Sequence, residues 1–225
     1  MKKIITVMVT VLALTACKFV SYSGNTMKSV TPKGPVETRT YDLKDFTGIE
    51  VNGHADVNFT QAEAFSVEVI SQADAFDYLD VRVEDGNLLV QTKDRVQLRT
   101  RELKVNVQAP VLNKVVVNGA ADLDIKGYKA DEDLQIVLNG AGDLDCKGVE
   151  VPSFAITVNG AGDIDALDME VGKLLVSVNG AGDATLSGHA GYARYTISGV
   201  GDIDARKLTA DDWSKEKNGV GSIKL

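Results

Sequence analysis

The residues best suited to chemistry in this sequence are aspartates that recur at a fixed spacing. Each lies three or five residues after the first glycine of a short motif, which reads Asn-Gly-Ala-Gly-Asp-Leu-Asp in one of its copies. Carboxylate oxygens are ligands that Ca²⁺ and Mg²⁺ prefer in proteins, so a row of them could hold calcium or face a ligand. The aspartates of the row are Asp122, Asp124, Asp143, Asp145, Asp163, Asp165, Asp183, Asp202 and Asp204.

A structural role competes with metal binding for these aspartates. The first aspartate of each motif follows a glycine bend, and aspartates at turns accept backbone N–H hydrogen bonds. Like charges about 5 Å apart repel by under about 1 kcal/mol per pair in water, so something must relieve the row. Thr185, Ser222 and Lys224 interrupt the pattern. These interruptions favour turn chemistry over a specific calcium site, and we expect no cofactor.

The motif is an internal repeat with a period of about twenty residues. Residues at even offsets from each first glycine are apolar, whereas the aspartates lie at odd offsets. Such alternation is typical of strands, and it points the aliphatic side chains inward and the carboxylates outward. An isolated copy occupies residues 51–58. The first glycines of the regular copies are Gly119, Gly140, Gly160, Gly180, Gly199 and Gly219.

The repeat predicts an all-β fold, a right-handed parallel β-helix with coils of about twenty residues. A unit of this size cannot bury a core alone, so the copies must stack. Leucine-rich repeats share the period but not the leucine spacing, and propeller blades need about twice the length. The handedness follows from the rule for parallel crossovers. Within a domain spanning 39–225, we expect regular coils over 113–225 and less regular coils or hairpins over 39–112, with a turn at 84–87.

Several single residues have structural interpretations. Ala55 and Ala121 replace the second glycine, which suggests that this site needs a small side chain rather than a positive φ. Cys146 is expected in the core, and Trp213 is expected to cover the open end of the stack. The final strand presents an edge through which copies could self-associate. The asparagines expected to form an amide ladder are Asn118, Asn139, Asn159, Asn179 and Asn218. The histidines, His54 and His189, have no partner at a ligand spacing.

The N-terminus indicates export. Lys2 and Lys3 precede an apolar run over residues 4–14, which is too short to span a bilayer. The sequence Leu-Thr-Ala-Cys that follows resembles a lipobox, which implies a signal peptide over 1–16 and an acylated Cys17.

The segment after the lipobox predicts how the chain is attached. Residues 17–38 are rich in Ser, Thr, Gly and Pro, and we expect a flexible tether there. Lys18, in place of an acidic residue, favours the outer membrane over the inner one, with either face open. We therefore expect a lipid-anchored protein of the cell envelope.

Charge and cysteine content exclude some partners and bonds. The formal net charge is −8, which disfavours binding to nucleic acid. Cys17 and Cys146 are the two cysteines of the chain. Because Cys17 is expected to carry lipid, no intramolecular disulfide is expected, and stability must come from the buried core.

The motifs in order resemble a known family. The segment 45–57, the apolar Leu88–Val90, the Gly-Ala-Gly-Asp copies and the closing 219–223 are similar to the head GIN domain family of putative auto-transporter adhesins. The similarity runs from about residue 40 to the end, with Val200 and Val220 where serine is commoner. It implies a β-helix on a lipoprotein or secreted chain, and it supplies no catalytic residues.

Three functions are compatible with these patterns. We favour a non-enzymatic envelope lipoprotein that binds an unidentified glycan or protein as an adhesin-like module. The alternative is a passive structural component of the envelope. A polysaccharide lyase or hydrolase is less favoured, because Arg194 and Arg206 are the arginines of the regular coils and neither has a recurring partner. A hydrolase also needs one special pair of carboxylates, unlike a repeated exposed row.

Overall fold

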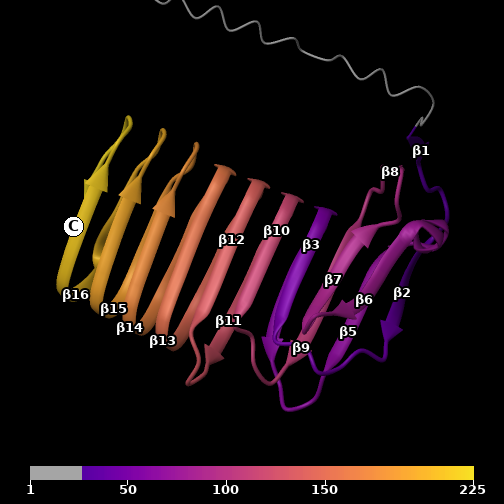
Figure 1. The fold of residues 1–225 in the computed structure, drawn as a ribbon, viewed down its shortest axis with the longest axis horizontal. Helices are drawn as coiled ribbons and strands as arrows, with labels where there is room; N and C mark the ends of the chain where they lie inside the picture. Colours follow the sequence, from indigo (N-terminus) through magenta and orange to yellow (C-terminus); the bar gives the residue numbers. More distant parts are fainter. Residues whose placement is uncertain (1–26) are drawn as a thin grey trace, which may run out of the picture.

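The computed structural model describes residues 27–225 as a long β-solenoid with a less regular N-terminal part (Figure 1). The predicted fold class is confirmed. The predicted signal peptide, Cys17 and the first part of the predicted tether lie outside the described residues. No helix within residues 27–225 is long and apolar enough to cross a membrane.

The coils stack as two rows of parallel strands, each row forming one long side of the solenoid. We call their outward surfaces face 1 and face 2. Face 1 is built by β7 (Asn87–Thr92), β3 (Gly48–His54), β10 (Lys114–Ala120), β12 (Leu134–Ala141) and the later halves of β13 (Leu144–Ala161), β14 (Ile164–Val178), β15 (Ala184–Ile197) and β16 (Ile203–Lys217). Face 2 is built by β9 (Leu103–Ala109), β4 (Asp56–Gln61), β11 (Leu123–Lys129), the earlier halves of β13 to β16, and β17 (Ile223–Lys224).

The even-offset side chains fill the space between the two rows. Successive coils place Ile156, Val176 and Tyr195 in register, and each is buried. The buried hydroxyl of Tyr128 donates to the Leu112 carbonyl oxygen at 2.7 Å and accepts from the Leu112 N–H at 2.9 Å. A buried polar group therefore keeps its hydrogen bonds.

Cys146 belongs to this core, as predicted. Its side chain is buried, and burial raises the pKa of the thiol far above its usual range. The thiol therefore stays protonated and behaves as a small apolar side chain.

The isolated early copy of the motif joins the regular stack. β3 lies between β7 and β10, so Asn52 pairs with Asn118 and Gly53 with Gly119. β4 lies in the same way between β9 and β11. The chain therefore makes its first coil at residues 48–61, leaves to build the N-terminal end, and returns to stack on that coil. The sequence pattern did not predict this order.

The N-terminal end consists of hairpins and edge strands. β6 (Leu79–Glu84) runs antiparallel to β7 through the predicted turn at 84–87. β5 (Ser66–Gln72) runs antiparallel to β9, and a 3₁₀ helix, η1 (Ala73–Tyr78), follows it.

The predicted end of the tether at residue 38 is wrong. β1 (Lys28–Val30) pairs with β8 (Val96–Leu98), and β2 (Val36–Tyr41) runs antiparallel to β5. The alternating β-branched residues Val36, Thr38 and Thr40 suit an extended strand on the open edge of β5. Two strands of the described chain, β1 and β2, therefore include residues of the range predicted as tether.

Backbone approaches backbone at the corner formed by the two glycines. A Cβ on Gly180 would lie 1.9 Å from the carbonyl oxygen of Gly160 in the preceding coil. The same distance separates a Cβ on Gly162 from the oxygen of Gly142. The prediction that the second glycine site needs only a small side chain is therefore wrong from Gly142 onward. Ala121 stacks on the early coil, where Ala55 occupies the same site.

The core ends at β16. Trp213 on this strand is in register with a row of side chains that are buried in the preceding coils. Its register partner Ala193 is fully buried, whereas Trp213 is 49% exposed. Trp213 thus lies at the end of the core, as predicted, and covers it only in part.

The far edge of β16 is largely unpaired within the described chain. On that edge β16 pairs with β17 at Ile203 and Asp204 alone. Self-association through this edge stays a prediction.

The glycine corner predicts the outcome of two matched substitutions. Gly180→Ala should lower the free energy of unfolding by about 3 kcal/mol, because its Cβ meets a rigid carbonyl although its φ lies outside the left-handed region. Gly127→Ala is the control, since Gly127 has φ +64° and open space around a Cβ. It should cost about 1 kcal/mol through backbone strain alone. Urea unfolding measures both, and equal losses would contradict the close approach.

Candidate functional site

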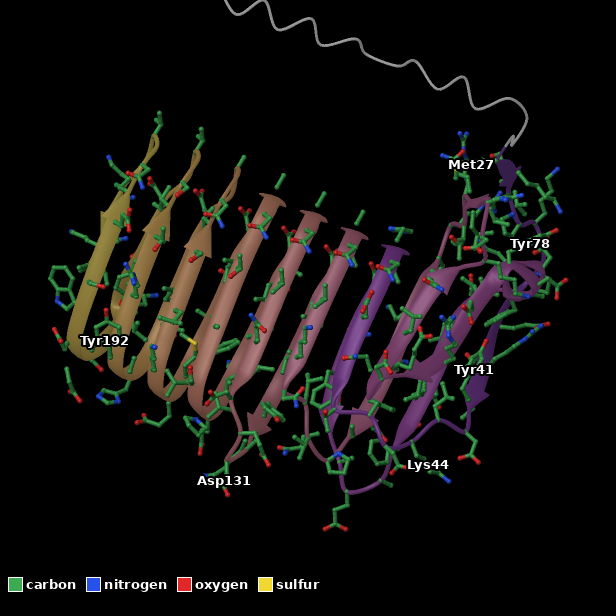
Figure 2. The ribbon with its side chains drawn as sticks, in the orientation of Figure 1. Met27, Tyr41, Lys44, Tyr78, Asp131 and Tyr192 are labelled. Atoms are coloured by element: carbon green, nitrogen blue, oxygen red, sulfur yellow. The ribbon has the colours of Figure 1, made fainter. Side chains whose placement is uncertain are left out.

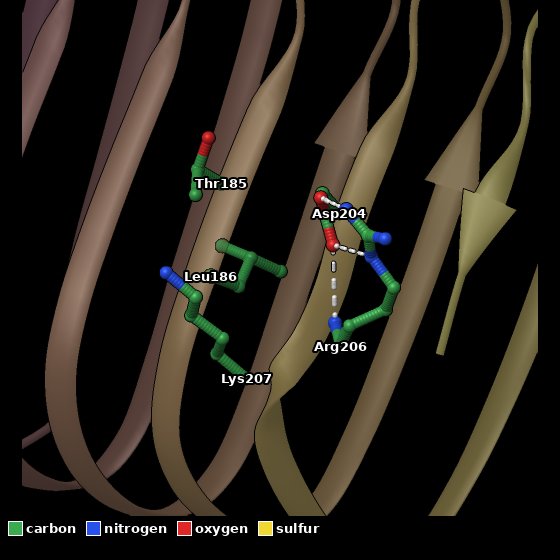
Figure 3. A pocket seen from close by; sticks show the side chains of 5 residues that line it. All are labelled: Thr185, Leu186, Asp204, Arg206 and Lys207. Carbon is green, nitrogen blue, oxygen red and sulfur yellow. Dashed lines mark hydrogen bonds and ion pairs between the residues drawn. The ribbon is translucent and has the colours of Figure 1, made fainter.

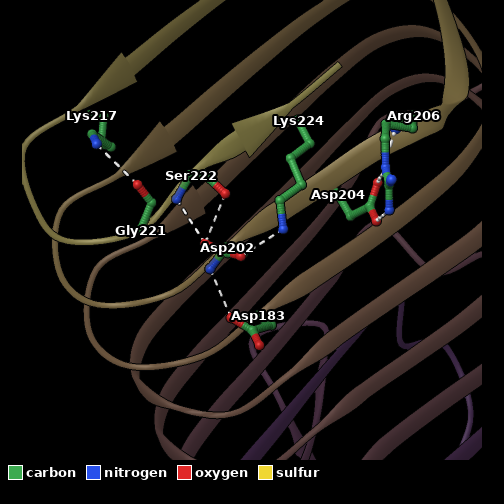
Figure 4. Close-up of polar contacts among 8 residues, drawn as sticks. All are labelled: Asp183, Asp202, Asp204, Arg206, Lys217, Gly221, Ser222 and Lys224. Carbon is green, nitrogen blue, oxygen red and sulfur yellow. Dashed lines mark hydrogen bonds and ion pairs between the residues drawn. The ribbon is translucent and has the colours of Figure 1, made fainter.

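The first aspartate of each motif forms a hydrogen-bonded ladder along the solenoid. One side-chain oxygen of each accepts the backbone N–H of the corresponding residue in the next coil, at N···O distances of 2.7–3.0 Å. The expected N–H bonding at the bend is present, but the donor belongs to the neighbouring coil. Figure 4 shows the last two steps. The ladder consists of Asp122, Asp143, Asp163, Asp183, Asp202 and Ser222.

The ladder ends on a cation rather than on another carboxylate. Lys224 Nζ donates to Asp202 at 2.8 Å, and both the N–H and the hydroxyl of Ser222 bond the same carboxylate (Figure 4). The Lys224 hydrogen bond first, and Ser222 next, hold the pKa of Asp202 below its usual range. Ser222 and Lys224, which interrupt the sequence pattern, thus satisfy the last aspartate.

The second aspartates line face 2 on neighbouring strands. Asp124, Asp145 and Asp165 are direct register partners. Partial burial first, and then the charges of Asp165 and Asp124, raise the pKa of Asp145. Lys126 relieves Asp124 through a 2.5 Å contact.

Arg206 holds the last aspartate of this row. Its Nε and Nη2 donate to the two oxygens of Asp204 at 2.9 and 2.5 Å (Figure 3). This bidentate pair holds the pKa of Asp204 well below its usual range. Because Arg206 is engaged in this way, it is a poor candidate for a catalytic base.

Face 2 carries two shallow hollows beside these pairs. One, of about 370 Å³, lies beside the Asp204–Arg206 pair (Figure 3). The other, of about 270 Å³, is lined by Asp124, Asp145 and Asp165 together with Lys126 and Lys147. Residues 27–225 contain no group of three or more His, Cys, Asp or Glu side chains placed to hold a metal ion. The calcium alternative therefore gains no support from the geometry.

The predicted amide ladder is present, but the residues that form it differ in part from those predicted. Asn118, Asn139, Asn159 and Asn179 each donate from Nδ2 to the Oδ1 of the preceding asparagine at 2.8–2.9 Å. Asn52 begins the ladder and was missed, because its coil is remote in sequence.

The prediction for Asn218 is wrong. Ser198 replaces asparagine one coil earlier, so Asn218 has no amide partner among residues 27–225 and bonds Glu216 at 3.0 Å instead.

His189 has partners that the sequence spacing concealed. Its Nδ1 lies 3.1 Å from Glu170 and its Nε2 lies 3.4 Å from Asp211, on the coils before and after. The hydrogen bond to Asp211 first, and that to Glu170 next, raise the pKa of His189. His189 thus links three coils. His54 lies 3.1 Å from the Ala120 carbonyl oxygen, a structural contact.

Face 1 differs from face 2 in having no carboxylates over its middle. Among the outward residues of β10 and β12 and of the face 1 halves of β13 to β15, the charged ones are Lys114, Lys173 and Arg194. Their neighbours are mainly Val, Thr, Ser and Asn.

A hollow of about 400 Å³ lies on face 1 between β14 and β15, and sequence reasoning missed it. The sequence signal was two cations and a tyrosine at outward offsets of neighbouring coils. Its lining consists of Lys173, Leu175, Ser177, Tyr192, Arg194 and Thr196.

The aspartate ladder predicts different effects for the two aspartates of one motif. Asp163→Ala should lower the free energy of unfolding by about 1 kcal/mol, because the Asp183 N–H loses its acceptor. Asp163→Asn, which keeps an oxygen acceptor, should restore most of this loss. Asp165→Ala is the control and should leave stability unchanged or slightly higher, since it removes a charge beside Asp145. Urea unfolding measures all three; a loss at Asp165 as large as at Asp163 would argue against the ladder.

Comparisons with known proteins agree on the fold. A family model described as "Putative auto-transporter adhesin, head GIN domain" matches residues 45–166 and 132–225. A putative adhesin from Parabacteroides distasonis is 23% identical with a TM-score of 0.76, over 87% of this chain and 84% of that one. A putative lipid binding protein from the same species is 20% identical with a TM-score of 0.74, over 88% and 96%. A putative adhesin from Bacteroides fragilis is 20% identical with a TM-score of 0.72, over 87% and 99%. No curated protein matches the chain.

Proposed function

Because the chain belongs to the head GIN domain family of putative auto-transporter adhesins, we propose that it is a non-enzymatic binding module of the cell envelope. The observation that carries this proposal is the chemical difference between its two faces. The glycine corner and face 2 carry aspartates that bond the next coil or a neighbouring cation. Face 1 presents hydroxyls, amides and cations without carboxylates from β10 to β15. A stacked solenoid offers such a face as one extended binding surface.

The aspartate rows support binding rather than turnover. A hydrolase needs two carboxylates with distinct environments in one cleft, and a lyase needs a base opposite an acidic cation site. The first aspartates repeat one bonding pattern from coil to coil, and Arg206 is engaged by Asp204. These features suit a structural role.

We further propose that the module is anchored to the outer membrane by lipid on Cys17. The Leu-Thr-Ala-Cys sequence supports this, as does the geometry of the described chain. Met27 lies at the opposite end of the stack from Tyr192 (Figure 2) and from β16 (Figure 1). A tether leaving at Met27 would let the regular coils project away from the membrane surface.

The two cysteines provide a matched test of the anchor. Cys17→Ser should abolish incorporation of labelled fatty acid and move the protein from the membrane fraction to the soluble fraction. Cys146→Ser changes a buried thiol and should leave both unchanged. Membrane association that survives Cys17→Ser would overturn the proposed anchor.

Binding itself is tested by screening the purified lipid-free chain, carrying Cys17→Ser, on glycan and protein arrays. We expect the chain to bind at least one ligand on these arrays and to leave that ligand chemically unchanged. Incubation with uronate polymers and calcium should release no unsaturated products. Release of such products would show a lyase, and a folded chain that retains nothing would favour a passive envelope component.

A further inference from the structure

We propose that the hollow on face 1 between β14 and β15 binds an acidic glycan, a polysaccharide bearing carboxylate or sulfate groups. Arg194 and Lys173 would meet the anionic group, and Tyr192 would contact the sugar ring. This inference rests on the proposed binding function and names its ligand class and site.

The register of two neighbouring coils assembles the hollow. Lys173 is the direct partner of Tyr192, and Leu175 is the direct partner of Arg194. Strands that are neighbours in a sheet lie about 4.8 Å apart, so the two cations flank one small area. The hollow's volume of about 400 Å³ falls within the range of small-molecule pockets. Leu175 and the tyrosine ring give it apolar surface, and hydroxyls border it.

Tyr192 is held in place before any ligand arrives. Its hydroxyl lies 2.7 Å from Ser214 Oγ on β16, and the side chain is half-buried. A ring fixed in this way presents an apolar surface at low entropic cost, which suits the apolar side of a pyranose.

The cations of this hollow are less neutralised than those of face 2. Lys126 and Arg206 each contact an aspartate at 2.5 Å. Among residues 27–225, Lys173 has no carboxylate within 4.0 Å, and Arg194 has only Glu216 at 3.7 Å. Both members of that last pair are more than half exposed, so their attraction is weak. The guanidinium fork of Arg194 is therefore free to bind a carboxylate or sulfate with two hydrogen bonds.

The position of the hollow favours a glycan over an acidic peptide. Extended peptides usually add to an open strand edge, and helical peptides dock into an apolar groove. β14 is paired on both sides by β13 and β15, and β15 is paired on both sides by β14 and β16. Their backbone groups are already used, so recognition must come from side chains. Hydroxyls, cations and one aromatic ring together match an anionic sugar.

The test compares purified full-length variants, all carrying Cys17→Ser, for binding to immobilised polygalacturonate and dextran sulfate. Arg194→Ala should weaken binding at least about tenfold, because it removes a charge-assisted contact. Glu216→Gln should strengthen binding several-fold, because it removes the competing carboxylate. Lys114→Ala is the matched control, since it removes a positive charge from the same outward row four strands away. It should leave binding unchanged, and circular dichroism verifies folding.

Each other outcome overturns the inference in a recognisable way. Equal losses in Arg194→Ala and Lys114→Ala would show a diffuse charge effect, and tighter binding to polyglutamate would show an acidic-peptide site. Equal binding to uncharged dextran would exclude anion recognition. If the protein with an intact hollow binds neither polymer while the arrays retain another ligand, this inference fails and the proposed function stands. If the arrays also retain nothing, the proposed function fails with it.

Discussion

The close approach of backbone to backbone at the glycine corner is the constraint on which the rest of this structure depends. From Gly142 onward, both glycines of each coil lie where a Cβ would collide with a carbonyl oxygen of the coil before it. Each of these coils can therefore stack only in the register that places its two glycines over the corner of the coil before it. Because side chains alternate along a strand, that single register fixes every other row. Aliphatic residues lie above one another inside, asparagines form an amide ladder, and aspartates form a ladder to the backbone of the next coil.

The stacking of the coils gives different parts of the surface different structural roles. Most of the aspartates that looked suited to chemistry accept N–H groups or pair with cations, whereas Asp145 and Asp165 are neighbours of like charge on face 2. The bonded aspartates stabilise the stack, and Lys126, Arg206 and Lys224 offset the negative charge of the aspartates that they contact. On face 1 the asparagine ladder links successive coils, but the other outward side chains from β10 to β15 make few bonds between coils. The face 1 positions outside that ladder are therefore less constrained by the stacking of the coils.

The sequence was sufficient for the features that repeat locally. The twenty-residue period and the even-offset apolar residues predicted the stack, the buried Cys146 and the outward aspartates. Features set by contacts between remote coils could not be predicted in the same way. The place of Asn52 beside Asn118 depends on the excursion of the chain between β4 and β10, and the carboxylates around His189 become neighbours only through stacking. The hollow beside Arg194 was equally hidden, because its lining comes from two coils. The demand for a second glycine reflects the backbone of the coil before it, which no local pattern records.

Disulfide trapping tests the stacking of the early coil most directly. In a background with Cys17→Ser and Cys146→Ser, the pair Asn52→Cys and Asn118→Cys should cross-link rapidly within one chain, because these residues are direct register partners. Neighbouring strands about 4.8 Å apart fall within the Cα separation that a disulfide requires. The pair Asn52→Cys and Asn139→Cys is two strands apart, at about twice that distance, and should not cross-link. Cross-linking of 52 to 139 in preference to 118 would contradict this account of the fold.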